Sequence, residues 1–500
     1  MAHAVPAPAP HVVVLASPGV GHVAPVAELA TRLAALHGVT STIVTYTNLS
    51  SAASLASLPP GISTAALPEV PLDDLPAGAH IVTRIVTVVQ RTLPHLRALL
   101  RSLLDDAPAG GVTAFLADML CPAALAVAGE LGVPRYVFYT SSLMSLVTLL
   151  YAPELARTTT CECRDLPGPV ALPGCLTLHG ADLVEPLQER ADPVYGLVVD
   201  MGLDYLLSDG FIVNTFDALE HETMEAFREL SDKGVYPPAY AVGPLVRSVS
   251  DEAAKHHRCV PWLDEQPDGS VLYVCFGSGG TLSTLQTAEL AAGLEASGQR
   301  FLWVVRFPND KDSSACYFGG KTTDHGDADA DDDPLSYLPE GFAERTRAVG
   351  LVVPEWAPQV EVLGHRAVGG FLTHCGWNSA LEAMAAGVPA LAWPLFAEQR
   401  MNAVKLASEH VGLALRVNAR EDRVVPREEV AAAARELMVG EKGAVARERA
   451  RELRAVARKA SAPGGPAHQA LAAVVDRWKC AAASSAAADA AAGGGLCMNP

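Results

Sequence analysis

The stretch that decides the fold is WAPQVEVLGHRAVGGFLTHCGWNSALEAMAAGVPALAWPLFAEQ, residues 356–399. Within it, an apolar run at 370–373 is followed by small polar residues and then by a helical pattern at 380–386. This order puts the polar residues at a helix N-terminus, where unpaired main-chain amides attract phosphate. Trp356 offers a ring on which a base can stack, and Glu398 with Gln399 offers an acceptor and an amide for sugar hydroxyls. Each residue alone is more typical of a core or a solvated surface, but their joint spacing favours a nucleotide-sugar site.

Strand and helix patterns alternate along both halves of the chain. In the first half, strand patterns lie at 11–17, 42–46, 114–117, 135–139 and 211–214. The series restarts in the second half, with strand patterns at 270–276, 301–305, 351–353, 370–373 and 390–392. Such alternation is typical of parallel sheets covered by helices on both faces. The predicted fold class is therefore α/β, with two Rossmann-like, doubly wound parallel-sheet domains.

The same patterns predict the division of the 500 residues into segments. We expect an N-terminal domain over 1–245, a polar linker over 246–262 and a C-terminal domain over 263–460. The low-complexity tail at 481–500 is expected to be disordered. The segment at 309–334, rich in Asp, Gly and Ser, is expected to be a mobile surface loop.

Composition excludes several classes of partner. The chain has 37 Lys and Arg against 56 Asp and Glu, a net charge of −19, which argues against binding to nucleic acid or to an anionic membrane. It shows no secretory signal pattern and no apolar run of the length that a membrane span needs. Ten cysteines scattered through the chain are typical of reduced thiols. We expect a cytoplasmic protein without integral membrane association.

The N-terminal half carries a candidate catalytic loop directly after its first strand. The loop is Pro18-Gly19-Val20-Gly21-His22, at the sheet edge where open α/β folds bind ligands. Residues 19–24 also satisfy the G-x-G-x-x-A dinucleotide pattern, so a nicotinamide-dependent oxidoreductase is an alternative. That alternative needs an acidic residue after the second strand, and residues 43–51 contain none.

Residues 356–399 resemble the C-terminal signature box of plant UDP-dependent glycosyltransferases, and the similarity extends from residue 11 to about 479. The segments FIVNTFDALE (211–220) and FGSGGTLSTLQ (276–286) are most similar to the hydroquinone (arbutin-type) and monolignol glucosyltransferase subgroup. The resemblance implies the GT-B architecture, in which two Rossmann-like domains face each other across a cleft. It also implies that a helix at 461–480 crosses back to the N-terminal domain.

The resemblance assigns roles to individual residues. His22 matches the catalytic base of the family, and Asp118 matches the aspartate that partners it. Glu398 stands where many relatives have Asp, and Gln399 is the residue usually associated with glucose. The positions matched to donor binding are Ser278, Trp356, Ala357, Gln359, His374, Gly376, Trp377, Asn378, Ser379, Glu382, Glu398, Gln399 and Thr140.

Together these observations predict an inverting UDP-glucose-dependent glucosyltransferase that forms β-O-glucosides of small phenols, such as hydroquinone, monolignols, flavonoids or xenobiotic phenols. A histidine suits the general base because its pKa lies near the working pH. A non-catalytic UDP-sugar receptor is a further alternative, disfavoured by the presence of both His22 and Asp118. We expect a monomer whose partners are a UDP-sugar and a phenol.

We expect no metal and no cofactor, because helix-terminus amides can stabilise the diphosphate. Asp329-Ala330-Asp331 is similar to the metal-binding Asp-x-Asp of another glycosyltransferase class. It lies in an acidic segment where such a match arises easily by chance.

Overall fold

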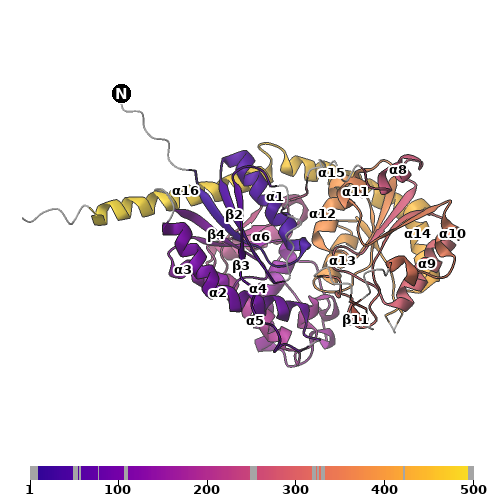
Figure 1. Cartoon of the computed structure of the whole chain (residues 1–500), viewed down its shortest axis with the longest axis horizontal. Coiled ribbons are helices and arrows are strands. Elements are labelled where there is room, and N and C mark those ends of the chain that lie inside the picture. Colours follow the sequence, from indigo (N-terminus) through magenta and orange to yellow (C-terminus); the bar gives the residue numbers. More distant parts are fainter. Residues whose placement is uncertain are drawn as a thin grey trace, which may run out of the picture.

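The described strands form two large sheets, one in each half, and one short two-stranded sheet (Figure 1). The computed structural model describes residues 9–48, 55, 58–76, 78–105, 111–247, 256–317, 322–323, 326–327, 333–420 and 423–493. Every neighbouring pair of strands in the two large sheets is parallel. The prediction of an α/β fold with two doubly wound parallel sheets is therefore confirmed.

The first sheet has seven strands in the order β3-β2-β1-β4-β5-β6-β7. The strands are β1 (His11–Leu15), β2 (Thr40–Tyr46), β3 (Ile62–Leu67), β4 (Val112–Asp118), β5 (Arg135–Tyr139), β6 (Phe211–Val213) and β7 (Ala239–Ala241). The α-helices between them are α1 (Val20–His37), α2 (Ile81–Asp105), α3 (Ala124–Glu130), α4 (Leu143–Thr158), α5 (Pro193–Asp204) and α6 (His221–Asp232). Short 3-10 turns are η2 (Cys163–Asp165), η3 (Gly180–Asp182), η4 (Glu185–Leu187), η5 (Tyr205–Leu207) and η6 (Asp217–Leu219).

Alternation of side chains along β1 divides the first core into two layers. Val12 and Val14 point to one face, where they pack with apolar residues of α1 and of the last helix, α16 (Pro466–Gly493). Val13 and Leu15 point to the other face, which α2, α3, α4 and α5 cover. Helices on both faces explain why the strands read as continuous apolar runs.

The second sheet has six strands in the order β12-β9-β8-β13-β14-β15. They are β8 (Val271–Cys275), β9 (Arg300–Val305), β12 (Gly350–Pro354), β13 (Val368–Thr373), β14 (Ala390–Ala392) and β15 (Ala414–Arg416), and a small hairpin joins β10 (Thr322–Thr323) to β11 (Gly326–Asp327). The helices are α8 (Cys259–Asp264), α9 (Thr284–Ser297), α10 (Phe342–Thr346), α11 (Gln359–Gly364), α12 (Trp377–Ala386), α13 (Gln399–Ala407), α14 (Arg427–Val439) and α15 (Glu441–Ser461), with a 3-10 turn η7 (Pro334–Tyr337).

The strand order of each sheet contains one point where the direction of winding reverses. In the first sheet this point lies between β1 and β4, and in the second it lies between β8 and β13. Open α/β sheets bind ligands outside the carboxyl ends of the two strands at such a point. The strand order alone therefore predicts a ligand-binding site at one edge of each sheet.

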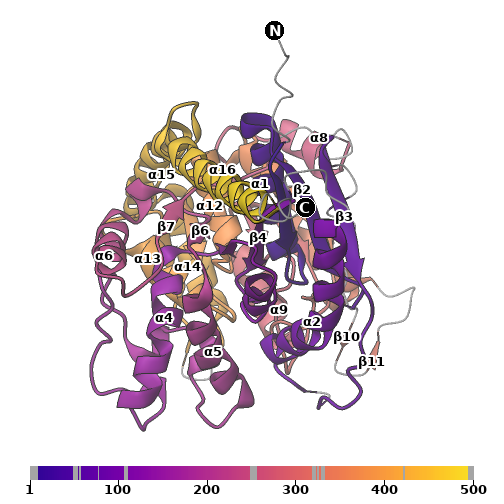
Figure 2. The same cartoon turned by 90° about the vertical axis from the view of Figure 1, so that its left-hand side faces the viewer.

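The last helix, α16, begins beside the second half and packs on the first. Figures 1 and 2 show it, in yellow, beside α1. Its side chains Leu471, Val474 and Trp478 belong to the same buried cluster as Val12 of β1. Helix α16 thus forms a second connection between the two halves, much later in the sequence than the first one.

Three features differ from the sequence-based expectations. The patterns missed the short or small-residue strands β3, β7 and β15, whose pairing comes from neighbouring strands rather than from their own side chains. The segment at 481–500 was expected to be disordered, but α16 continues to Gly493. Alanine has the highest helix propensity, which favours this continuation. Part of the expected linker, 248–255, and the tail at 494–500 lie outside the described residues.

We predict that Trp478→Ala lowers the free energy of unfolding by about 3–5 kcal/mol, the usual loss when a large core aromatic is removed. Trp478 is fully buried and meets Tyr136 edge-on at 5.8 Å between ring centroids. Urea and thermal unfolding would measure the loss. Trp356→Ala is the control, because Trp356 is 53% exposed and its removal should leave the unfolding midpoint unchanged. Equal midpoints for Trp478→Ala and the wild type would contradict the role of α16 in the first core.

Candidate active site

A histidine and an aspartate meet at the winding reversal of the first sheet. Asp118 is the last residue of β4, and His22 lies in the first turn of α1, directly after β1. Nδ1 of His22 is 2.9 Å from Oδ1 of Asp118 and 3.1 Å from Oδ2. The aspartate side chain is fully buried and the histidine is 13% exposed. The two residues are 96 positions apart in the chain and are brought together by the pairing of β1 with β4.

The aspartate is held by other donors as well as by the histidine. The Ser17 hydroxyl and the main-chain amide of Leu120 both donate to Oδ1 of Asp118. Burial by itself would lower the pKa of His22, but the charge of Asp118 and the hydrogen bond with it outweigh burial, with a smaller contribution from Glu398. The pKa of His22 is therefore raised above its usual 6.5.

The two ring nitrogens of His22 face different surroundings. Nδ1 faces Asp118 and also lies 3.3 Å from the hydroxyl of Thr140. A carboxylate beside Nδ1 favours the tautomer with its proton there, which leaves Nε2 as the basic nitrogen. Thr140 is buried, at the end of β5. The arrangement can accept a proton at Nε2 and stabilise the resulting imidazolium.

A second histidine lies at the winding reversal of the other sheet. His374 follows β13, and its ring lies between Gly277 and Gly376, where an added Cβ would come within 2.4 Å of it. Only glycine permits this approach, and Gly277 also has a φ of +77°. Burial, with a smaller contribution from Arg306, lowers the pKa of His374 to about 4. The imidazole is therefore neutral at pH 7 and can offer one N–H donor next to Gly277, the residue that precedes Ser278.

The first turn of α12 follows His374. This helix begins at Trp377, and its first amides have no partner within the helix. Asn378 donates to the carbonyl of Gly21 at 2.6 Å, so it joins the catalytic loop of the first half. The indole of Trp377 is buried and donates to the carbonyl of Asn214 at 2.7 Å. Its side chain therefore serves the packing between the halves, which leaves only its main chain for a diphosphate.

Beside this turn lies a network of polar side chains. The amide of Gln359 donates to the Ser379 hydroxyl at 2.8 Å and to Oε2 of Glu382 at 2.7 Å. Burial raises the pKa of Glu382 to about 7, although Gln359 and Arg247 act in the opposite direction. A carboxyl group with this pKa can accept or donate a hydrogen bond near neutral pH.

The ring of Trp356 is exposed beside this network. It lies at the edge of the second sheet, after β12, and is 53% exposed, with His257 edge-on at 5.6 Å. Ala357, which follows it, is buried. An exposed, supported aromatic face is suited to stacking with a planar base.

Glu398 and Gln399 begin helix α13 and already make contacts. Oε1 of Glu398 accepts from the hydroxyl of Ser141, in the first half, at 2.9 Å. Oε1 of Gln399 accepts from the main-chain amides of Leu395 and Phe396 at 2.9 and 3.0 Å. The Gln399 oxygen therefore shapes its own loop, and its side-chain NH₂ is the group left for a sugar hydroxyl.

Sequence reasoning missed Tyr317. The segment at 309–334 was expected to be a surface loop, but the ring of Tyr317 packs against Gly19 of the catalytic loop and against Gly279. Its hydroxyl lies 3.4 Å from the carbonyl oxygen of Pro18. Burial raises its pKa, and the charges of Asp118 and Glu398 add to that effect. The two glycines that receive the ring were the available signal in the sequence.

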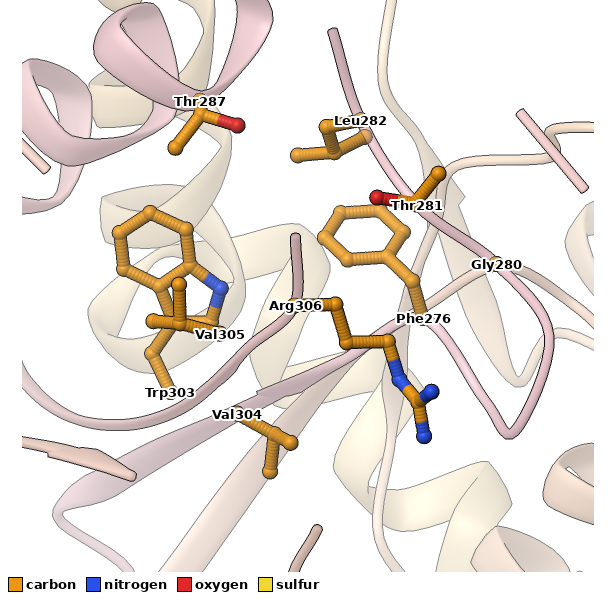
Figure 3. Close-up of a pocket in the computed structure, with 9 residues that line it drawn as sticks. All are labelled: Phe276, Gly280, Thr281, Leu282, Thr287, Trp303, Val304, Val305 and Arg306. Atoms are coloured by element: carbon orange, nitrogen blue, oxygen red, sulfur yellow. The ribbon is translucent and has the colours of Figure 1, made fainter. Parts of the chain in front are cut away.

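Arg306, at the end of β9, was also missed. It lines a small hollow behind the glycine loop that follows β8, together with Phe276 and Gly280. Figure 3 shows its side chain beside Phe276, with the guanidinium turned away from Trp303. Its Nε is buried without a hydrogen-bond partner. The described residues thus include a cation close to His374.

The described part of the chain has neither a metal-binding cluster nor a helix suited to a membrane. No group of three or more His, Cys, Asp or Glu side chains there could hold a metal ion. Asp329 and Asp331 lie outside the described residues. Among the described residues, no helix is both long and apolar enough to cross a membrane.

Comparison with known proteins gives one consistent family. Residues 210–447 match the profile described as UDP-glucoronosyl and UDP-glucosyl transferase. The chain is 43% identical to a hydroquinone glucosyltransferase of Rauvolfia serpentina, over 94% of this chain and 98% of that protein. It is 44% identical to UDP-glycosyltransferase 72B1 of Arabidopsis thaliana, over 94% and 96% of the two chains.

Solved structures agree with these sequences. UGT2 of Phytolacca americana, complexed with UDP-2fluoro-glucose and pterostilbene, superposes with a TM-score of 0.82 at 40% identity and covers 94% of this chain and 100% of that chain. A UDP-glucosyltransferase from Polygonum tinctorium capable of glucosylating indoxyl, in complex with 3,4-dichloroaniline, gives a TM-score of 0.85 at 41% identity, with 95% and 100% covered. The GT-B architecture implied by the sequence is confirmed.

We predict that Asp118→Asn lowers the pKa of His22 from above 6.5 to below it. The substitution removes the charge that raises the pKa, and burial, which lowers it, stays. NMR titration of ring-labelled histidine would measure the change, and His374 is the internal control because its low pKa does not depend on Asp118. An unchanged His22 titration in the variant would show that Asp118 does not set the protonation of the imidazole.

Proposed function

Because the chain belongs to the UDP-glucoronosyl and UDP-glucosyl transferase family and is a UDP-glycosyltransferase, we propose that it transfers glucose from UDP-glucose to the hydroxyl of a small phenol, with inversion. The relatives named hydroquinone glucosyltransferase and the complex with pterostilbene support a phenolic acceptor. The observation that carries the proposal is the contact between His22 and Asp118 at the winding reversal of the first sheet.

In the proposed reaction, Nε2 of His22 takes the proton of the phenol as its oxygen attacks the anomeric carbon. Asp118 holds the proton on Nδ1 and stabilises the imidazolium. The bond between the anomeric carbon and the diphosphate oxygen breaks as the new bond forms on the opposite face. An α-linked donor thus gives a β-glucoside in one displacement, without a covalent intermediate.

The leaving UDP is held by the second half of the chain. Amides in the first turn of α12, at Asn378 and Ser379, and the N–H of His374 stabilise the diphosphate charge, so the proposal needs no metal. Trp356 stacks on the base, Ala357 contacts its edge through the main chain, and Gln359 and Glu382 bind the ribose. Glu398, Gln399 and Thr140 contact the sugar.

The two other functions named from the sequence are less well supported. A nicotinamide-dependent oxidoreductase does not agree with the family. A UDP-sugar receptor without turnover would have no need for a buried aspartate aligned on a histidine. We further propose that the enzyme acts in the cytosol as a monomer, and the described cysteines, which are all free thiols, agree with a reducing compartment.

We predict that His22→Ala lowers kcat for phenol glucosylation by about 10²- to 10⁴-fold, the usual loss on removing a general base. UDP affinity should stay at the wild-type value, because the nucleotide is held by the other half. An acceptor screen with UDP-glucose in EDTA, read by mass spectrometry, identifies a phenol, and calorimetry measures UDP binding. His221→Ala, at a histidine that is 52% exposed, is the control. Full turnover in His22→Ala would refute the mechanism.

A second prediction concerns the sugar. Gln399→Glu keeps an oxygen for the amides of Leu395 and Phe396 but removes the NH₂ donor. We expect a higher KM for UDP-glucose, by roughly tenfold as one hydrogen bond is lost, with an unchanged melting temperature. Steady-state kinetics with UDP-glucose and UDP-galactose would measure it. If only Gln399→Ala, which also loses the loop contacts, impairs the enzyme, the residue shapes the loop and does not bind glucose.

A further inference from the structure

A buried ion pair joins the two halves of the chain beside the site. Lys405, on α13 of the second half, places its Nζ 3.1 Å from Oε1 of Glu220, which follows η6 in the first half. The side chains are 6% and 0% exposed. Most ion pairs described in this chain have at least one exposed partner, and an exposed pair contributes little. Because the pair of Lys405 and Glu220 is buried, water screens its charges little, and breaking it leaves a buried charge without a partner.

The carboxylate of Glu220 holds the beginning of helix α4. Its Oε2 accepts from the amide of Leu143 at 2.7 Å, and its Oε1 accepts from the amide of Met144 at 3.1 Å. Amides in a first turn have no partner within the helix, and a negative charge there is stabilised by the helix dipole. Glu220 therefore fixes the start of α4 and the three residues that precede it.

Those three residues, 140–142, touch the proposed catalytic machinery. The hydroxyl of Thr140 lies 3.3 Å from Nδ1 of His22. Ser141 donates to Glu398 at 2.9 Å, and Ser142 lies 3.4 Å from Asn402. The start of α4 is thus in contact with the base on one side and with the sugar-binding residues on the other.

On the second half, one face of α13 makes all of these contacts. Glu398, Asn402 and Lys405 are spaced by four and three residues, which puts them on the same side of a helix. Asn402 also donates to the carbonyl of Cys375, next to His374, at 3.0 Å. Met401 of the same helix packs in the hydrophobic core of the first half. Helix α13 therefore carries the sugar residues at its start and is docked on α4 by its next two turns.

Stability alone does not account for a charged pair in this place. Replacing a buried pair by apolar side chains is often neutral or stabilising, because two charges must be desolvated. The Lys405 ammonium can bind the Glu220 carboxylate only when α13 lies within reach of it, and Glu220 in turn holds the start of α4.

We propose that Lys405 and Glu220 are positioning residues that set the place of Glu398 and Gln399 relative to His22. The inference rests on the proposed function of that site. Misplacing reacting groups by about 1 Å can cost 10²-fold in rate. The pair therefore controls turnover, and not the binding of UDP, which lies on the second half alone.

The test is Lys405→Met, which keeps the length of the side chain and removes its charge. We expect kcat per folded molecule to fall roughly ten- to hundredfold, with UDP affinity unchanged and with partial recovery in Lys405→Arg. The melting temperature should fall as well, because the buried Glu220 keeps its charge without a counter-charge. Lys459→Met, at an exposed lysine of α15, is the matched control. Hydrogen exchange of the peptide that covers the start of α4 should be faster in Lys405→Met than in the wild type, and unchanged in Lys459→Met.

The second variant is Glu220→Gln, which leaves Lys405 buried without its counter-charge. We expect it to be less stable than the double variant Lys405→Met/Glu220→Gln, in which no unpaired charge is left. Strictly additive effects on stability would overturn the pairing. An unchanged kcat in Lys405→Met would overturn the positioning role, whatever hydrogen exchange shows.

The two hypotheses fail differently. If the wild type transfers glucose but Lys405→Met is equally fast, only the positioning inference is lost. If the wild type transfers glucose to no phenol, the proposed function is lost. In that case, faster hydrogen exchange at the start of α4 in Lys405→Met would still show that the pair positions this segment, and unchanged exchange would show that it does not.

Discussion

Hydrogen bonds across the seam between the two sheets hold together a site that neither sheet contains alone. Trp377 donates to the carbonyl of Asn214, and Asn378 donates to that of Gly21. Both donors lie in the first turn of α12, the same turn whose amides face the diphosphate in the proposed function. A shift of one half against the other would therefore break these bonds and separate the base from the donor at once. The strand orders place the two catalytic edges, and the seam sets the distance between them.

Electrostatic surroundings give the titratable groups of the site different roles. Asp118 keeps the pKa of His22 above its usual value, whereas burial lowers the pKa of His374 to about 4. The first histidine is thereby paired with a carboxylate, and the second stays neutral between Gly277 and Gly376. Burial also raises the pKa of Glu382 to about 7. Such separation of pKa values by environment is how similar side chains come to perform different tasks. Salt screens distant surface charges, so the net charge of −19 does not by itself prevent an anionic donor from binding.

The sequence predicted the sheets and the two catalytic edges because these depend on local patterns. Apolar runs identified β1 and β13; a glycine-containing loop with His22 follows the first, and small polar residues that begin with His374 follow the second. Tyr317 and the pair of Lys405 with Glu220 could not be found in this way. Their burial depends on how the halves pack, and no pattern next to Lys405 or Tyr317 in the sequence signals it. For Tyr317 the signal lies far away in the chain, in the two glycines that receive its ring. The end of α16 was missed for the opposite reason, since low complexity was given more weight than alanine's helix propensity.

The length of Glu398 links the packing of the two halves to the sugar binding that we propose for this residue. An aspartate at the same position would be shorter by one carbon–carbon bond, about 1.5 Å. From the same main-chain position it could not reach the Ser141 hydroxyl, which Glu398 contacts at 2.9 Å. The extra methylene lets one carboxylate oxygen bind the first half, while the other oxygen has no hydrogen-bond partner among the described residues. In the proposed reaction that second oxygen accepts from the sugar. One side chain then both holds the donor and fixes the donor's helix against the loop that carries Thr140, so the sugar is placed with respect to the base through a single residue.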